Sequence, residues 1–273
     1  MEKKSIVYND VNVFYKVTGE GAPVVLIHGF AEDGTIWKCQ ELFLKDHFRL
    51  IIPDIPGSGQ SDYLPLDNIT ASGIIDRYAD IIKKIIDKES VKNCVVIGHS
   101  MGGYIALAFA QKYADNLNGL GLFHSTAFAD TDEKKKNRIK GIEFIQKHGA
   151  QEFLKQSIPN LFGSKFTAEH RADITELINA SGNFTSLALV HYYEAMMHRP
   201  DRTEVLKNIS KPVLFIMGEE DKSVYLQDSL SQCHLPLLSL IDILPDVAHM
   251  GMWEMKDQAN VTVMKFLNYT LDV

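Results

Sequence analysis

Six short, mainly apolar runs recur along this chain of 273 residues, and each is bounded by Gly, Pro or Asp. A strand with one face in water alternates apolar and polar residues, whereas continuous runs of this length are typical of strands buried on both faces of a parallel sheet. Before these runs, the turn residues Asn9 and Asp10 lie between a first short apolar run and 11–17, which predicts an N-terminal hairpin. The six predicted strands are 24–27, 50–52, 94–97, 120–123, 213–217 and 238–244.

Helical patterns lie between the predicted strands. Residues 74–86 place their apolar side chains on one stripe of a helix, 102–112 is largely apolar and predicts a buried helix, and 261–269 belongs to a last one. Strands that alternate with helices predict βαβ units, so the expected fold class is α/β with a mostly parallel sheet and helices on both faces.

The alternation stops between residues 126 and 207. This stretch contains helical patterns and turn signals such as Ile158-Pro159-Asn160, but no convincing strand run. An insertion of this size between two strands of one sheet predicts a helical cap or lid. We therefore expect a core domain formed by 1–125 and 208–273, and a cap domain formed by 126–207.

The strongest chemical signal is the segment Gly98-His99-Ser100-Met101-Gly102, which follows a predicted strand and precedes a predicted helix. A serine on such a sharp strand-to-helix turn has its hydroxyl lifted clear of the sheet, and the strained backbone leaves no room for a Cβ atom two residues before or after it. The helix that begins after the serine points its positive end toward developing negative charge. We predict that Ser100 is a nucleophile.

A nucleophilic serine needs a base, and the base needs an acid that orients it. The predicted strand 213–217 ends in Gly218-Glu219-Glu220-Asp221. An acid just past the carboxyl end of a strand lies at the edge where such sheets place their active sites. We predict Asp221 as the acid because it lies furthest out in the loop, with Glu219 and Glu220 as the alternatives.

Only two histidines follow Asp221 in the chain. His234 precedes the predicted strand 238–244 and therefore lies at the wrong end of the sheet. His249 follows that strand and precedes a helix, which brings it to the same edge as Ser100. We predict that His249 is the base.

Backbone N–H groups should stabilise the oxyanion that forms when the serine attacks. One donor is expected from Met101, the residue after the nucleophile, and the other from Phe30 in the loop after strand 24–27. In that loop Gly29 allows close backbone approach. We expect His28 to brace the loop through hydrogen bonds rather than to act in catalysis.

Taken in order, these segments resemble motifs of the α/β-hydrolase superfamily, most closely its capped, cofactor-free, esterase-like members. The resemblance covers nearly the whole chain except the cap. Its motifs are His28-Gly29-Phe30, Asp54-x-Pro56-Gly57-x-Gly59-x-Ser61, Gly98-His99-Ser100-Met101-Gly102-Gly103, Gly218-Glu219-Glu220-Asp221-Lys222 and the late His249.

This resemblance implies an eight-stranded sheet with an antiparallel second strand, a cap inserted after the sixth strand, and no cofactor. Some superfamily members carry Asp at the nucleophile position and act on carbon–halogen or epoxide bonds, and Ser100 argues against both activities. Other members carry the acid of the triad after the sixth strand. Asp130 or a neighbouring residue is therefore an alternative to Asp221.

Composition excludes several other classes. The net charge of −7 is spread along the chain and argues against nucleic acid as a partner, and the one basic cluster, Lys134-Lys135-Lys136-Asn137-Arg138, is expected to be a solvated helix face. The chain has no apolar run of about 18 residues, so we expect no membrane span. Three scattered cysteines and an N-terminus without an apolar core predict a cytoplasmic protein, either a monomer or a homodimer, with a small-molecule substrate.

Neither a metal nor a nucleotide cofactor is expected. The histidines are scattered, and no metal-ligand spacing occurs. Pro56-Gly57-Ser58-Gly59 resembles the start of a dinucleotide-binding loop, but it lacks a third glycine and a helix directly after it. We interpret it as a turn that supports the floor of the active site.

The cap is expected to determine the substrate. Its aromatic residues and methionines predict an apolar acyl or aryl pocket, to which we assign Phe128, Phe162, Tyr192 and Met196. His191, His198 and Arg199 are the cap groups that could hold a charge. We predict hydrolysis of a small, mainly apolar or aromatic ester. The alternatives are a carbon–carbon bond hydrolase or acyltransferase with the same triad, and a non-enzymatic small-molecule sensor on the same fold.

Overall fold

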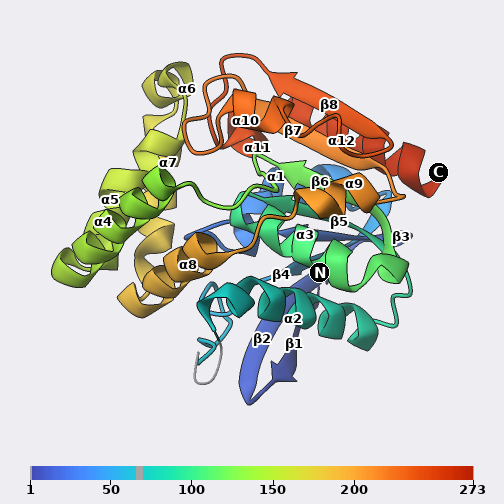
Figure 1. The fold of residues 1–273 in the computed structure, drawn as a ribbon, viewed down its shortest axis with the longest axis horizontal. Coiled ribbons are helices and arrows are strands. Elements are labelled where there is room, and N and C mark those ends of the chain that lie inside the picture. Colours follow the sequence, from blue (N-terminus) through green and yellow to red (C-terminus); the bar gives the residue numbers. More distant parts are fainter. Residues whose placement is uncertain (1, 66–69, 273) are drawn as a thin grey trace.

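The computed structural model describes residues 2–65 and 70–272, and its centre is an eight-stranded sheet with the strand order β1-β2-β4-β3-β5-β6-β7-β8 (Figure 1). β2 is antiparallel to both of its neighbours, and every other neighbouring pair is parallel. The expected α/β fold with a mostly parallel sheet is therefore confirmed. The strands are β1 (Glu2–Tyr8), β2 (Val11–Thr18), β3 (Ala22–Ile27), β4 (Phe48–Pro53), β5 (Cys94–His99), β6 (Leu117–Phe123), β7 (Val213–Gly218) and β8 (Ser239–Leu244).

The central strands are buried on both faces, as their continuous apolar sequences predict. Every residue of β5 and of β7 is buried. The last strand differs, because β8 is an edge strand in which Ile241 is 50% exposed and Ile243 is 40% exposed. The expectation of two covered faces is wrong for β8, since a run of apolar residues does not reveal which strand ends the sheet.

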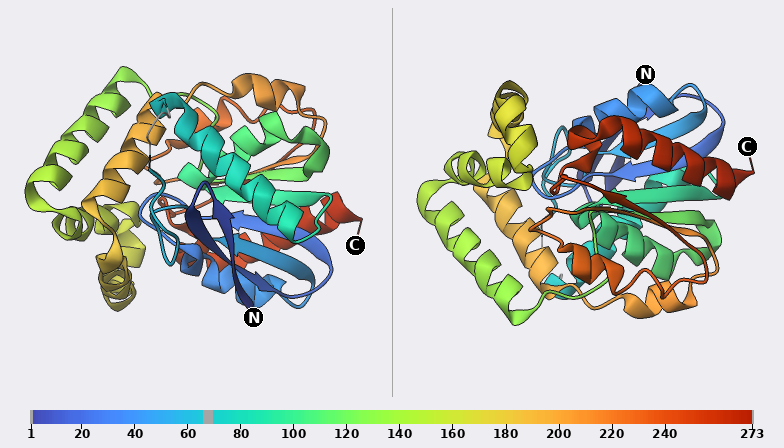
Figure 2. Two further views of the ribbon diagram at one scale, coloured as in Figure 1. Left: turned by 90° about the horizontal axis from the view of Figure 1, so that it is seen from below. Right: turned by 90° about the horizontal axis from the view of Figure 1, so that it is seen from above.

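Helices cover both faces of the sheet (Figure 2). α2 packs on α3 on one face, and α1 packs on α12 on the other. The three helices predicted from periodicity are α2, α3 and α12. The helices are α1 (Lys38–Leu44), α2 (Ile74–Lys88), α3 (Met101–Lys112), α4 (Asp132–His148), α5 (Ala150–Ser157), α6 (Ser164–Glu169), α7 (Arg171–Ala180), α8 (Ser186–His198), α9 (Thr203–Asn208), α10 (Leu226–Leu230), α11 (Gly251–Glu254) and α12 (Lys256–Leu271).

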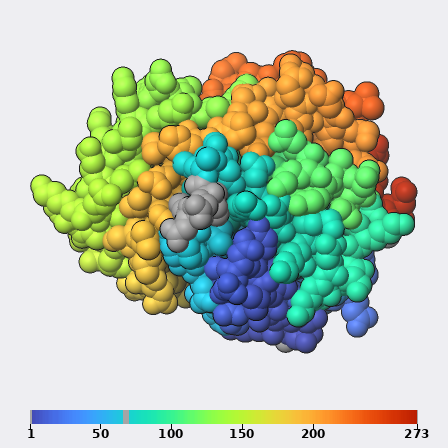
Figure 3. Space-filling view, turned by 60° about the horizontal axis from the view of Figure 1, so that its bottom comes forward, coloured from blue at the N-terminus to red at the C-terminus, as the bar shows by residue number. Residues whose placement is uncertain are grey.

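The long connection between β6 and β7 is helical throughout its regular structure. α4 to α8 gather at one end of the molecule, and the space-filling view shows this lobe, in yellow-green to gold, packed against the core (Figures 1 and 3). The N–H of Arg202 donates to the carbonyl of Ala127 at 2.8 Å, so the two ends of the lobe lie side by side. We propose 126–207 as the extent of this cap, although its last helix, α9, contacts α3 of the core.

In the described part of the chain, no helix combines the length and the apolar character needed to cross a membrane.

Candidate active site

Ser100 lies on the turn between β5 and α3, with φ of 49° and ψ of −115°. Such a positive φ is uncommon for a residue with a side chain and stores strain. The turn has no room for extra atoms, because a Cβ on Gly98 would lie 2.1 Å from the carbonyl oxygen of Gly102, and one on Gly102 would lie 2.3 Å from that of Ile27. The glycines therefore allow the tight packing that lifts Ser100 to the carboxyl edge of the sheet.

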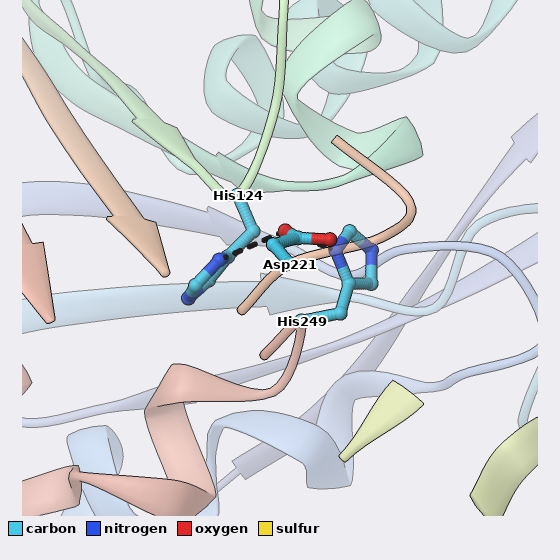
Figure 4. Close-up of side chains that lie close together, drawn as sticks. All are labelled: His124, Asp221 and His249. Atoms are coloured by element: carbon cyan, nitrogen blue, oxygen red, sulfur yellow. Dashed lines mark hydrogen bonds and ion pairs between the residues drawn. The ribbon is translucent and has the colours of Figure 1, made fainter. Parts of the chain in front are cut away.

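Asp221 and His249 come together at the same edge (Figure 4). The Nδ1 of His249 donates to the Oδ2 of Asp221 at 2.8 Å, while the N–H groups of Ser223 and Val224 donate to the other carboxylate oxygen at 2.8 and 2.9 Å. Both side chains are buried. Because Nδ1 carries the proton, the Nε2 of His249 is left as the basic nitrogen.

The pKa shifts of this pair agree with an acid that orients a base. Burial acts to raise the pKa of Asp221, but the charge of His249 and the hydrogen bonds from His124 and His249 outweigh it and hold the pKa well below its usual value. Burial likewise acts to lower the pKa of His249, but the charge and hydrogen bond of Asp221 outweigh it, so this pKa lies above its usual value. Asp221 therefore stays ionised, and its charge favours the protonated form of His249.

His124 is a second histidine on the same carboxylate (Figure 4), and it was not predicted from the sequence. It follows β6 directly, and its Nδ1 lies 3.2 Å from the Oδ2 of Asp221. The N–H of Gly251 donates to its Nε2 at 3.3 Å, so the ring proton is on Nδ1 and points at Asp221. Burial lowers the pKa of His124 to about 4, which keeps the ring neutral. A histidine directly after a buried strand was the one signal that could have identified it.

The closeness of His124, Asp221 and His249 also resembles a metal site, since one ligand atom of each lies within 4.8 Å of the others. The hydrogen bonds account for this closeness. Both Nδ1 atoms carry protons that are donated to Asp221, so neither has a lone pair for a metal ion.

The loop after β3 is held from below by the buried carboxylate of Glu32. Its Oε2 accepts hydrogen bonds from the N–H of Gly29 at 2.6 Å and from the Nδ1 of His99 at 3.0 Å. The Nε2 of His99 lies 3.0 Å from the carbonyl oxygen of His249. The His99 ring thus lies between the carboxylate of Glu32 and the carbonyl of His249. This chain of contacts joins the loop, the serine turn and the histidine loop.

The predicted oxyanion donors lie on this braced loop and at the start of α3. Met101 is the first residue of α3, and first-turn N–H groups have no carbonyl partner inside their own helix. Phe30 follows Gly29 and lines the cavity in front of Ser100. His28 is buried and bonded to the carbonyl of Gly29 and to the N–H of Ile55, both at 2.9 Å, so it braces the loop.

Glu254 fastens the loop of His249 to the cap. Its Oε1 accepts from the N–H groups of Ala248 and Met250 at 3.1 and 3.0 Å, on either side of His249, and its Oε2 accepts from the N–H of Gly163 in the cap at 2.7 Å. The N–H of His249 also donates to the carbonyl of the cap residue Leu161 at 2.9 Å. The position of His249 therefore depends directly on the cap.

A cavity of about 480 Å³ lies between the sheet edge and the cap, and both Ser100 and His249 line it. Of the four predicted substrate contacts, Met196 lies on its wall. Phe128, Phe162 and Tyr192 do not, which corrects the assignment of these three residues.

Each of these three aromatic residues makes contacts outside the cavity. The ring of Phe162 stacks on that of Phe166, with centroids 5.2 Å apart. Tyr192 is buried and donates to the carbonyl of Pro56 at 2.9 Å. Phe128 is half-buried, and its carbonyl accepts from Arg199 at 2.8 Å. Apolar character alone did not distinguish packing residues from lining residues.

This geometry has counterparts among known proteins. Residues 22–254 match a family described as alpha/beta hydrolase fold. The chain belongs to the α/β-hydrolase family. A thermophilic esterase from Thermogutta terrifontis, described as malate bound, matches this α/β hydrolase with a TM-score of 0.90 and 28% identity over 99% of both chains.

Curated relatives of this α/β hydrolase carry several activities in their names. A 2-hydroxy-6-oxononadienedioate/2-hydroxy-6-oxononatrienedioate hydrolase from Burkholderia vietnamiensis is 24% identical over 94% of the chain and 91% of its own length. A putative carbamate hydrolase, RutD, from Pantoea ananatis is also 24% identical, over 77% of the chain and 76% of its own length.

The other acids and the other histidine that could have served as acid or base in this α/β hydrolase have different environments. Glu219, Glu220 and His234 are exposed. Asp130 is buried in ion pairs with Arg138 and Arg199. His249, which is hydrogen-bonded to Asp221, lines the same cavity as Ser100.

The glycines of the serine turn lead to a first prediction. We expect Gly102→Ala to lower the free energy of unfolding by about 1–3 kcal/mol, because the new Cβ forces the backbone of the loop after β3 to move. Urea denaturation followed by circular dichroism measures this change. The control is Gly182→Ala, where the nearest atom is the flexible Oε1 of Gln151 at 3.4 Å. Equal stabilities of the two variants would contradict the prediction.

A second prediction concerns Glu254. We expect Glu254→Gln to reduce kcat about 10-fold, roughly the value of one hydrogen bond, because an amide cannot accept from all three N–H groups. The charge of Glu254 also raises the pKa of His249, so the acidic limb of the kcat/KM profile should shift to lower pH. The matched control is Glu219→Gln at an exposed acid, which should change neither quantity. An unshifted limb in Glu254→Gln would show that Glu254 does not act on His249.

Proposed function

We propose that this protein is a serine hydrolase that cleaves small carboxylic esters through an acyl-enzyme on Ser100. One observation carries the proposal: Ser100, on its strained turn, lines the same cavity as His249, whose ring is oriented by the buried Asp221. The similarity to the Thermogutta terrifontis esterase over nearly the full length of both chains supports ester hydrolysis.

The proposed reaction uses each group in turn. The Oγ of Ser100 attacks the acyl carbon while the Nε2 of His249 accepts its proton, and Asp221 stabilises the resulting imidazolium. The N–H groups of Phe30 and Met101 stabilise the oxyanion. The alcohol leaves with the proton from His249. A water molecule, deprotonated by His249, then attacks the acyl-enzyme. The bond to the Oγ of Ser100 breaks as His249 returns the proton to that oxygen, which releases the acid and restores both residues.

The size and lining of the cavity are consistent with a substrate that has a small acyl or aryl group. Its volume of about 480 Å³ is near the lower end of the usual range for ligand pockets. One wall is apolar and is formed by Leu154, Ile158, Leu161, Leu177 and Met196. A small, mainly apolar or aromatic ester fits this wall.

Carbon–carbon bond hydrolysis is a second candidate. Several relatives that match 94–95% of the chain at 22–25% identity are named as hydrolases of 2-hydroxy-6-oxo-dienoates or of related dienedioates. Incubation with such a compound, followed by product analysis, would separate the two activities. A product pair that arises from cleavage between two carbon atoms would favour the second candidate.

A test of the nucleophile uses a fluorophosphonate probe and mass spectrometry. We expect the label on Ser100, and turnover of p-nitrophenyl acetate, butyrate and octanoate. Ser100→Ala should lose the label and about 10⁴–10⁶-fold in kcat. Retention of most esterase activity by Ser100→Ala would overturn the proposal.

The raised pKa of His249 predicts the pH dependence. His249 acts as a base only when it is neutral, so kcat/KM for p-nitrophenyl butyrate should fall as the pH decreases through a pKa above 6.5, the ordinary value. Asp221→Asn removes the charge that raises this pKa, so the limb should move to lower pH while kcat drops about 10⁴-fold. A wild-type limb at or below 6.5 would contradict this assignment.

A further inference from the structure

A buried charge cluster lies beside the active-site cavity, where the chain enters the cap. The carboxylate of Asp130 has no exposed surface and pairs with two arginines. Arg199 donates from Nη1 to its Oδ1 at 2.7 Å, and Arg138 donates from both Nε and Nη2. One carboxylate neutralises only one of two guanidinium groups. The cluster therefore has a surplus positive charge that is only partly hydrated, because Asp130 and Arg199 are buried and the Arg138 side chain is 18% exposed.

Arg199 provides the structural part of this cluster. It also donates to the carbonyl of Met196 at 2.5 Å and to that of Phe128 at 2.8 Å, and its guanidinium lies 3.8 Å from the ring centre of Tyr104. Phe128 and Met196 lie near the two ends of the cap, so Arg199 and Asp130 fasten these ends together. Arg138 is not needed for this purpose.

Arg138 instead faces the cavity. It lines the same space as Ser100, and its side chain is 18% exposed. Among residues 2–65 and 70–272, no hydrogen-bond partner is found for its Nη1. The expectation of a solvated helix face, made for 134–138, is therefore wrong for Arg138. The pattern of charged residues in 134–138 does not reveal that the Arg138 side chain faces the cavity.

Aromatic packing fixes the place of Arg138 relative to the reaction centre. Its guanidinium lies 5.6 Å from the ring centre of Tyr193, and this ring stacks on that of Phe30 with centroids 4.5 Å apart and planes at 14°. Gly141 makes the packing possible, because a Cβ there would lie 2.7 Å from Tyr193. The guanidinium is thus one aromatic ring away from Phe30 and the predicted oxyanion donors.

The other charges on the cavity wall are balanced or solvated. Lys134 pairs with Asp228 at 3.3 Å, and Glu32 pairs with His99 at 3.0 Å. Glu133 and Lys222 are exposed to solvent. Arg138 shares the single carboxylate of Asp130 with Arg199, so its charge is only partly balanced.

We propose that Arg138 binds a carboxylate of the substrate, several bonds from the scissile carbonyl. This proposal rests on the ester hydrolase function proposed above. A planar guanidinium with free N–H groups suits a carboxylate, and binding one would neutralise the surplus charge of the cluster. The apolar wall formed by Leu154, Ile158 and Met196 would hold the carbon chain that joins the two ends. The substrate class is therefore an ester that carries a free carboxylate.

Two pairs of esters test this class and place the carboxylate. In the first pair the acyl part differs: the mono-p-nitrophenyl ester of glutaric acid is compared with p-nitrophenyl valerate. In the second pair the alcohol part differs: the acetate ester of 3-(4-hydroxyphenyl)propionic acid is compared with that of 4-propylphenol. We expect the wild-type enzyme to have a lower KM for the charged member of at least one pair.

Variants then assign the preference to Arg138. Arg138→Met keeps an unbranched, largely apolar stem and removes the charged guanidinium, so kcat/KM for the preferred charged ester should fall about 10–100-fold, mainly through KM. The neutral ester should change by less than about 3-fold, the size of effect expected when no charged contact is lost. Arg138→Lys should retain part of the preference. The matched control is Arg171→Met, at an exposed arginine on α7 outside this cavity, which should not change the ratio.

The outcomes separate this inference from the proposed function. Equal kcat/KM ratios in the wild type and Arg138→Met would overturn the carboxylate site and leave the hydrolase standing. Hydrolysis of none of the four esters, without labelling of Ser100, would instead overturn the proposed function. If Arg138→Met fails to fold, competitive inhibition of wild-type turnover of p-nitrophenyl valerate by glutarate decides the matter. Inhibition by glutarate but not by the neutral glutaramide supports the site, and no inhibition by glutarate overturns it.

Discussion

The proposed chemistry of this protein depends on one buried carboxylate, that of Asp221. A charge removed from water is tolerated only when hydrogen bonds replace its hydration. Asp221 receives four, from the N–H groups of Ser223 and Val224 and from the rings of His124 and His249. These donors come from segments that follow β6, β7 and β8. Satisfying a single charge therefore draws the ends of three neighbouring strands together and sets the orientation of the base.

A parallel sheet makes this convergence possible, because all of its carboxyl ends meet at one edge. The same edge carries a second network, in which the Glu32 carboxylate binds Gly29 and His99, and His99 binds the carbonyl of His249. Two buried carboxylates thus anchor the loops near the serine turn: Glu32 holds the loop after β3, and Asp221 holds His249. The strain at Ser100 is sustained by this surrounding structure.

Much of this arrangement could be predicted from the sequence, because local rules determine it. Continuous apolar runs indicated the strands, and the glycines around Ser100 indicated a turn without room for side chains. The supporting residues His124, Glu32 and Glu254 could not be predicted, since their roles arise from contacts between segments far apart in the chain. The cap was the hardest part. Some of its aromatic residues pack inside the cap and others line the cavity, and their sequence does not tell the two groups apart. The Arg138 side chain faces the cavity beside Tyr193, which packs closely on Gly141.

The hydrogen bonds that join the cap to the histidine loop have a thermodynamic consequence. Leu161 and Gly163 contact the same short segment that carries the base, directly and through Glu254. Leu161 also lines the cavity, so a ligand that displaced it would alter the hydrogen bonds of the segment that carries His249, and with them its proton affinity. Protonation of His249 and ligand binding beneath the cap would then be linked, so the affinity of the cavity for its ligand would vary with pH.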